Sequence, residues 1–350
     1  MATRRAFLAG LAAATLPRPG WADVGSPAYL AAAKLAGGSF VLHGLSAAGD
    51  SLFAIPLPAR GHAGCAHPTL ATCVAFARRP GTYALVLDAF SGDILHQLTP
   101  PENRHFNGHG TYSADGRLLY TVEQDATDST GYLGLWDTSQ YTRLTEVPTH
   151  GIGPHDMKRL KDGTLLIANG GIATDPTDRS KLNLPSMRAN LAQLDAQGQL
   201  ISLAELPPGL HQNSIRHLAI TPTGAACALQ WEGDPADPVP LLGLWQAGQI
   251  TLHASPEADT YRMQAYAGSI AATSAHIAIT SSHGGVVQLF GHDGSFIATL
   301  PRTDASGIAA MGDAFLVTDG TGALTRMTGA GFTPLNLLPL AWDNHLVALT

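Results

Sequence analysis

The sequence predicts an all-β protein: a seven-bladed β-propeller that closes when its C-terminal strand pairs into the first blade. Short apolar or alternating runs recur along the chain, and turn signals rich in Gly and Asp separate them. The runs group into units of roughly 40 to 60 residues, the period of a four-stranded propeller blade. Only 13% of the residues are charged, whereas 38 glycines and 23 prolines suit a chain with many turns.

Six units follow one another, and the two ends of the chain supply a seventh. The six units occupy residues 67–100, 109–147, 155–206, 217–255, 268–300 and 306–338. The segment 28–57 contains only three strand-like runs, and the terminal HLVALT (345–350) has no partner of its own. Placing this tail as the inner strand of the first blade completes the ring. A large sandwich, or a propeller of six or eight blades, is the alternative.

Residues 1–22 have the pattern of a twin-arginine signal peptide. Arg4 and Arg5 precede an apolar run over residues 6–16, and the small residues around Ala22 suit cleavage before Asp23. The apolar run is shorter than the about 20 residues that a membrane-spanning helix needs. We therefore expect a periplasmic protein without a membrane span, whose residues 23–350 form a single propeller domain.

Composition excludes some classes of function. The formal net charge of −7 gives no basic surface for nucleic acid or an anionic membrane. The sequence also lacks a G-x-S-x-G motif, a Walker loop and a C-x-x-C-H haem-attachment motif. The spacing of the three cysteines, Cys65, Cys73 and Cys227, is not that of a metal site. Two interpretations remain: a Cys65–Cys73 disulfide, or three buried thiols. Beyond the signal peptide, Arg78 and Arg79 are the only adjacent arginines.

Histidine recurs at or near one position of the repeat, and this pattern predicts a metal site. After three of these histidines, a Gly-containing turn follows seven or eight residues later. The inner strands of a propeller surround one axis, so we expect the imidazoles to converge at one channel mouth, as metal-ligating imidazoles do. The candidate ligands are His67, His109, His155, His217 and His345. His67 fits less well, because its turn comes later, and His62 is the substitute.

Further polar residues are expected around these histidines. The second strand of a blade ends where the inner strand begins, and some loop histidines lie four to six residues before the ring histidines. Five imidazoles exceed what one tetrahedral ion accepts, so some residues would support the ligands rather than bind the metal. The candidates are Arg60, His62, His105, Glu123, Asp156, Asn169, His211, Gln230 and Asp343. The alternative interpretation is that the histidines only cap strands and bond to loop carbonyls.

The chain resembles a known family at the same residues. It is similar to the twin-arginine-exported, iron-regulated bacterial proteins of unknown function that are often encoded beside imelysin-like proteins. The matching segments span almost the whole mature chain: RGHAGCAHP (60–68), FARRPGTYALVLD (76–88), RHFNGHGTYSADGRLLYT (104–121), HGIGPHD (150–156), ANGGIATDP (168–176), KLNLPSM (181–187), LHQNSIRHLA (210–219) and AWDNHL (341–346).

The resemblance implies a seven-bladed propeller with a link to periplasmic iron handling, but no demonstrated activity. One departure is Asp156, where the family pattern leads us to expect Glu. We expect a protein that binds a transition-metal ion, with iron favoured, although imidazole suits Fe, Cu, Zn and Ni alike. One alternative is a metal-dependent oxidoreductase or hydrolase with Glu123 or Asp156 as base. The other is an interaction platform for imelysin-like partners.

The export prediction can be tested at the arginine pair. Changing Arg4 and Arg5 to Lys should trap full-length precursor in the cytoplasm, because the twin-arginine pattern is lost. Fractionation followed by immunoblotting measures the two forms. Normal appearance of mature protein in the periplasm would contradict the signal-peptide interpretation.

Overall fold

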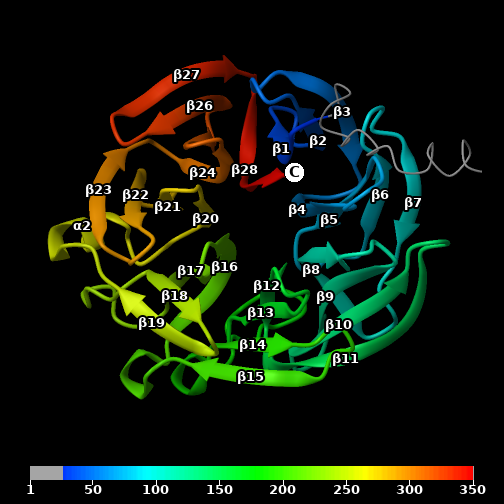
Figure 1. Cartoon of the computed structure of the whole chain (residues 1–350), viewed down its shortest axis with the longest axis horizontal. Coiled ribbons are helices and arrows are strands. Elements are labelled where there is room, and N and C mark those ends of the chain that lie inside the picture. Colours follow the sequence, from blue (N-terminus) through cyan, green and yellow to red (C-terminus); the bar gives the residue numbers. More distant parts are fainter. Residues whose placement is uncertain (1–26, 350) are drawn as a thin grey trace, which may run out of the picture.

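The computed structural model describes residues 27–349, which form seven four-stranded antiparallel sheets arranged in a ring (Figure 1). The predicted signal peptide and the domain boundary at residue 23 lie outside the described residues. The predicted seven-bladed propeller is confirmed. The first three blades, from inner to outer strand, are β28 (Leu340–Ala348), β1 (Tyr29–Leu35), β2 (Phe40–Leu45) and β3 (Ser51–Leu57); β4 (Gly61–Ala66), β5 (Thr72–Ala77), β6 (Ala84–Asp88) and β7 (Ile94–Leu98); and β8 (Arg104–Tyr112), β9 (Leu118–Asp125), β10 (Thr130–Asp137) and β11 (Thr142–Ile152).

The remaining blades repeat the same order. They are β12 (Pro154–Arg159), β13 (Leu165–Asn169), β14 (Asn190–Leu194) and β15 (Leu200–Glu205); β16 (Asn213–Thr221), β17 (Gly224–Trp231), β18 (Leu242–Gln246) and β19 (Gln249–His253); β20 (Ser269–Ala272), β21 (His276–Ser281), β22 (Val286–Gly291) and β23 (Phe296–Pro301); and β24 (Ala305–Met311), β25 (Ala314–Asp319), β26 (Ala323–Thr328) and β27 (Gly331–Leu337).

Helical structure is sparse in the described residues. It consists of α2 (Glu257–Arg262) and the 3-10 turns η3 (Leu184–Ser186) and η4 (Pro208–Leu210). Within residues 27–349, no helix is long and apolar enough to cross a membrane.

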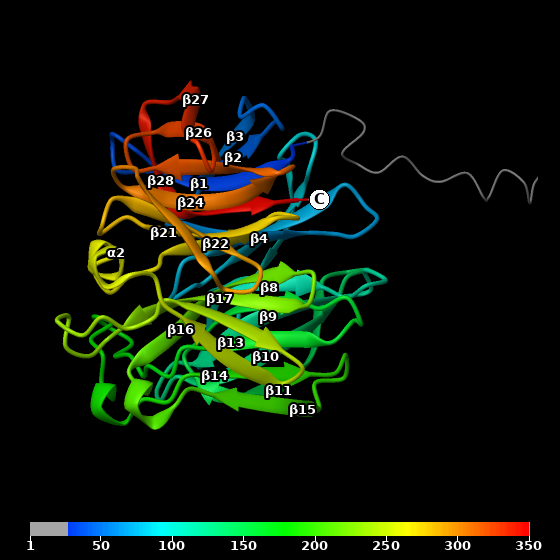
Figure 2. The same cartoon turned by 60° about the vertical axis from the view of Figure 1, so that its left-hand side comes forward.

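The C-terminal strand closes the ring as predicted. β28 pairs antiparallel with β1, with Val347 opposite Leu30 and Ala348 opposite Tyr29. It also lies beside β24 of the last blade (Figure 2). Trp342 and Leu346 of β28 are buried in one apolar cluster with side chains of their own blade and of the last blade. The ends of the chain are therefore held together by backbone pairing and by side-chain packing.

Alternating side chains build the cores between blades. Leu165 and Ile167 of β13, for example, pack against Val122 and Leu133 of the preceding blade, and all four are fully buried. Glycines allow the tight turns between strands. Gly163, for example, has φ 86°, a left-handed value that glycine adopts without steric cost. The three cysteines, which the sequence left open, are buried free thiols.

The inner strands depart from regular pairing. Six of the seven have a register shift against the second strand of their blade, and β20 alone among them keeps a regular register. A β-bulge of this kind re-aims the side chains at the shift and is common beside functional sites. The shifts occur at Gly61–Gly64, Phe106–Gly110, Pro154–Asp156, Ile215–His217 and Ala305–Ile308, and in β28 between Trp342 and Leu346.

The role of β28 in stability can be tested at Trp342. Trp342→Ala should lower the free energy of unfolding by about 3–5 kcal/mol, because the side chain is 4% exposed in the core at the closure. Urea denaturation measures the loss. The matched control is Leu337→Ala on the outer strand β27, where the side chain is 68% exposed and a change under about 0.5 kcal/mol is expected. A loss below about 1 kcal/mol for Trp342→Ala would show that the closure contributes little.

Candidate metal centre

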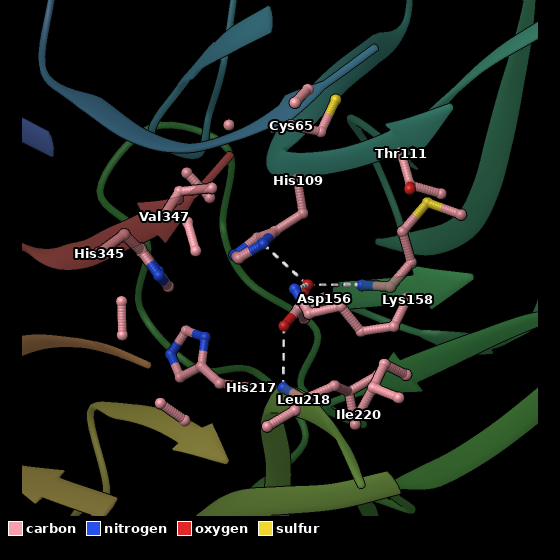
Figure 3. A pocket seen from close by; sticks show the side chains of 18 of the residues that line it. Cys65, His109, Thr111, Asp156, Lys158, His217, Leu218, Ile220, His345 and Val347 are labelled. Carbon is pink, nitrogen blue, oxygen red and sulfur yellow. Dashed lines mark hydrogen bonds and ion pairs between the residues drawn. The ribbon is translucent and has the colours of Figure 1, made fainter. Parts of the chain in front are cut away.

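Five imidazoles form one layer across the channel of the propeller. The ring centroids of His62 and His345 are 4.1 Å apart, those of His217 and His345 4.6 Å, and those of His155 and His217 4.7 Å. The ring of His109 lies 4.8 Å from that of His345 and 5.0 Å from that of His62. Figure 3 shows three of the five, from β8, β16 and β28, pointing toward one another. Each histidine comes from a different blade, so only the closed ring assembles the layer. We call these five residues the histidine layer.

The bulges of the inner strands place the layer inside the channel rather than at its mouth. His62, His155 and His345 lie within a register shift, and His109 and His217 lie in or beside one. The strands begin earlier than the sequence analysis expected, so that a histidine falls within its strand rather than at its start. A cavity of about 530 Å³ lies on one side of the layer and a smaller one of about 270 Å³ on the other, and His217 lines both.

Asp156 fixes the orientation of His109. The Nδ1–H of His109 donates to Oδ1 of Asp156 at 2.9 Å (Figure 3). The carboxylate also accepts from the backbone N–H of Leu218 at 2.8 Å and from Nζ of Lys158 at 3.1 Å. Since an ionised carboxylate only accepts, Nδ1 carries a proton, and the neutral tautomer that keeps this bond has its lone pair on Nε2 of His109. This is the support that metal-binding histidines usually receive from a carboxylate.

Burial and charge act in opposite directions on Asp156. Burial alone would raise the pKa of its carboxyl, but the nearby His109 and Lys158 lower that pKa below its ordinary value. Asp156 therefore stays ionised and keeps its hydrogen bonds. The carboxylate of Asp156, which is shorter than the Glu expected at this position, contacts Nδ1 of His109 instead of entering the histidine layer.

Two sets of three histidines have the spacing of a metal site. In His62–His109–His345 and in His109–His155–His217, one nitrogen from each ring lies within 4.8 Å of the other two. The Nε2 atoms of His62 and His345 are 3.1 Å apart. Nitrogens bound to one metal at about 2.1 Å lie about 3–4 Å from each other, so small ring rotations suffice to ligate an ion. His109 belongs to both sets.

Unsatisfied nitrogens show that the layer fits a cation. His109 Nε2, His62 Nδ1 and His217 Nδ1 are buried without a hydrogen-bond partner among the described residues. A buried polar atom without a partner costs about 1–3 kcal/mol, and native structures contain few of them. A metal bound to Nε2 of His109 would remove one such cost. The residues present therefore fit a transition-metal ion.

Burial favours the neutral form of His62, His155, His217 and His345. It lowers the pKa of His62 to about 4, and it lowers the pKa of His155, His217 and His345 well below 6.5, with the neighbouring histidine charges adding to the effect. Neutral imidazole is the form that ligates metals.

His67 does not belong to the layer, which corrects its place among the candidate ligands. Its Nδ1 accepts from the backbone N–H of Leu70 at 3.0 Å, and its Nε2–H donates to the carbonyl of Gly116 at 3.1 Å. Both nitrogens are thus used, and the ring packs 4.9 Å from that of Tyr112. The strand begins at Gly61, so His62 supplies the imidazole of this blade.

The predicted residues at the ends of second strands lie outside the layer. Glu123 accepts from Arg143 at 2.7 and 2.9 Å within its own blade. Asn169 bonds with Thr149 of β11 in the preceding blade at 2.8 Å. Gln230 lines the smaller cavity. The sequence placed these residues at the right end of the strand, but the side chains of the first two bond to Arg143 and Thr149 instead of reaching the layer.

Of the remaining predicted residues, two lie away from the histidine layer and two lie beside it. His105 is opposite Gln124 in the blade, and His211 bonds to the carbonyl of Pro208, so neither contacts the layer. Asp343 pairs with Arg60, and its other oxygen lies 3.9 Å from Nδ1 of His62. Asp343 therefore lies beside the layer at His62, as Asp156 does at His109, and Arg60 pairs with it.

Sequence reasoning missed two cations that adjoin the layer. Lys158 bonds Asp156, and Nη1 of Arg216 lies 3.4 Å from Nδ1 of His155. The available signal was proximity in the chain, since Arg216 directly precedes His217 and Lys158 follows His155 by three residues.

Metal-free protein should lose stability in acid because of the layer. The unfolded state of His62 binds a proton near pH 6.5 and the folded state near 4, so folding is most favourable above 6.5 and weakens as pH falls toward 4. His62 alone accounts for roughly 3 kcal/mol over this range. Denaturation of metal-free protein at pH 7.5 and 4.5 measures the difference. His62→Gln should reduce it, and His96→Gln on exposed β7 should not. Equal pH dependence in both variants would contradict the burial of a neutral His62.

Comparison with known proteins agrees with the fold. The model of a family described as "Protein of unknown function (DUF1513)" matches residues 55–349, and no curated protein matches. A chain of hydrazine synthase from Kuenenia stuttgartiensis aligns with a TM-score of 0.62 at 14% identity, covering 80% of this chain and 86% of that one. A chain from a crystal structure of the mitotic checkpoint complex aligns with a TM-score of 0.55 at 13% identity, covering 79% and 77%. At such identity these structures share the fold alone. Since the family model covers most of the sequence, this chain belongs to the DUF1513 family of proteins of unknown function.

Proposed function

We propose that this protein binds a transition-metal ion, iron in the first place, in the histidine layer and takes part in periplasmic iron uptake or handling. The observation that carries the proposal is His109, whose Nδ1 is held by Asp156 while its buried Nε2 faces the other rings without a partner in the described chain. A fixed tautomer and a free buried lone pair are what a metal ligand needs. A strand-capping histidine, such as His67, instead uses both nitrogens in hydrogen bonds.

Binding is favoured over catalysis by the state of the carboxylates. Asp156 accepts hydrogen bonds from the backbone N–H groups of Met157 and Leu218 and from Nζ of Lys158, besides its bond with His109. Glu123 is held by Arg143 away from the layer. Neither is free to act as the base of a hydrolase. Five converging imidazoles also supply enough donors to complete a coordination sphere without substrate, which suits storage or transport.

The choice of iron and of the periplasm rests on the sequence. Imidazole donors alone suit several metals, and the preference for iron comes from the resemblance to iron-regulated proteins. The periplasmic location comes from the arginine pair and the apolar run of residues 1–22. Imelysin-like proteins are the proposed partners on the same ground, since proteins encoded side by side often act together.

The metal site is tested by removing the shared ligand. His109→Ala should abolish stoichiometric metal, because both sets of three histidines contain His109. Metal content of protein purified from the periplasm, measured by mass spectrometry, gives the result and names the ion. His155→Ala and His217→Ala should weaken binding by disrupting one set. Circular dichroism should show the same β-rich fold, because channel side chains contribute little to the blade cores.

Matched variants separate coordination from general damage. His67→Ala removes a buried histidine of the same channel that lies outside the layer, and it should leave metal content unchanged. Asp156→Asn should weaken affinity about 10–100-fold, as loss of such a supporting carboxylate does. Equal metal content in wild type and in the folded His109→Ala variant would overturn the proposal.

A further inference from the structure

The smaller cavity beside the histidine layer carries an excess of positive charge that the metal proposal does not use. Five cationic side chains line it: Arg78, Arg79, Arg179, Lys181 and Arg216. They come from three different blades, from the loops that follow β5 and β13 and from the inner strand β16. Arg78 and Arg79 are the adjacent arginines of the sequence. Distant segments of the chain thus converge on one small space.

The carboxylates near this cavity are too few to balance the charge. Lys181 pairs with Glu232, whose other oxygen lies 3.8 Å from Nη2 of Arg216. Asp343 pairs with Arg60. In residues 27–349, no carboxylate lies within 4 Å of the guanidinium groups of the three remaining arginines, which are Arg78, Arg79 and Arg179. Arg78 and Arg79 are half-buried whereas Arg179 is exposed, so the cost of an unpaired charge falls mainly on the first two unless a counter-ion binds.

Arg79 and Arg216 show this imbalance most clearly. Nη1 of Arg79 and Nε of Arg216 are buried and have no hydrogen-bond partner within the described part of the chain. Burial, followed by the like charges of Arg216 and Arg179, lowers the pKa of Arg79 to about 9. The positive charges of Arg79, Arg179 and Arg216 therefore repel one another, and all three residues line the same cavity. Planar guanidinium donors bind carboxylate and phosphate oxygens with paired hydrogen bonds.

An acceptor without a partner, Oδ1 of Asn107, indicates that the ligand also carries a hydrogen-bond donor. Oδ1 of Asn107, which lines the same cavity, is buried and without a partner among residues 27–349, while Nδ2 of Asn107 already donates to Gln124. An amide oxygen requires a donor, which a hydroxyl group supplies and a bare anion does not. The cavity volume of about 270 Å³ suits a small molecule. A small polycarboxylate with a hydroxyl group matches both the donors and the acceptor.

The cavity opens onto the histidine layer. His62, His155 and His217 line it together with the arginines. Nη1 of Arg216 is 3.4 Å from Nδ1 of His155, so an anion held by Arg216 lies beside the imidazoles. Carboxylate oxygens are themselves metal ligands. One molecule can thus contact the guanidinium groups on one side and a metal in the layer on the other.

We propose that this cavity binds a small hydroxylated polycarboxylate, held by the guanidinium groups of Arg79, Arg179 and Arg216 against the histidine layer. The inference deepens the proposed function, since it names the anion that would accompany the metal. The charge of the cavity does not depend on a metal, so the anion site is tested by itself.

The test is calorimetric titration of citrate into the mature protein at low ionic strength. Metal is removed beforehand with an immobilised chelating resin, because soluble chelators are themselves polycarboxylates. We expect saturable binding at a single site that weakens as NaCl is raised, since screening reduces the attraction between the charges. Inorganic phosphate is titrated in parallel. Stronger binding of phosphate than of citrate would overturn the polycarboxylate assignment.

Arginine variants locate the site. Arg79→Gln and Arg179→Gln should each weaken citrate binding about tenfold or more, because each removes a charged donor. Arg179 lies on an exposed loop, so its variant tests the site even if Arg79→Gln fails to fold. The matched control is Arg326→Gln on β26, an exposed arginine outside the cavity, which should bind as wild type does. No citrate binding by wild type, or equal affinity in all three variants, would overturn the inference.

The two proposals fail separately. Metal-free His109→Ala should still bind citrate, because His109 does not line this cavity. Citrate binding together with a lack of metal in the wild type would refute the metal site and leave the anion site standing. Stoichiometric metal without citrate binding would refute only the anion site.

Discussion

Closure of the ring by β28 is the constraint on which the candidate site depends. His345 lies on this strand, and the other four histidines of the layer come from four other blades. The layer exists only when the ends of the chain pair, so its assembly is coupled to folding of the whole propeller. The apolar contacts of Trp342 and Leu346 within the first blade and with the last blade stabilise the arrangement. A metal bound by one set of three histidines would connect three blades at their common axis and add its binding free energy to the stability of the folded ring.

Much of the fold followed from the sequence because the repeat is local. Each turn and strand-like run is visible within a few residues, and an unpaired tail beside an incomplete first unit leaves closure as the simplest solution. Five histidines at or near one position of the repeat likewise predicted that their imidazoles converge, and four of the five lie in the histidine layer. These features depend on spacing along the chain, which a sequence displays directly.

The depth and exact membership of the layer could not be predicted, because bulges depend on pairing between strands. A shift of one residue exchanges the two faces of a strand, so the register between β4 and β5 decides that His62 enters the channel while His67 turns to Gly116. The same limit applies to Glu123 and Asn169, which lie at the expected strand ends but bond to Arg143 and Thr149 instead of reaching the layer. Arg78, Arg79 and Arg179 of the smaller cavity come from loops whose paths carry no periodic signal.

The two sides of the layer differ in charge, and this asymmetry bears on how a metal arrives. On the wider side, Asp156 and Lys158 compensate each other beside His109. On the narrower side, arginines outnumber the acids, which opposes the approach of a bare cation and attracts anions. A divalent or trivalent ion entering from that side crosses the barrier most easily when anionic ligands already surround it. If the layer binds a metal as proposed, entry from the narrower side would favour a metal carried in a negatively charged complex over a bare cation.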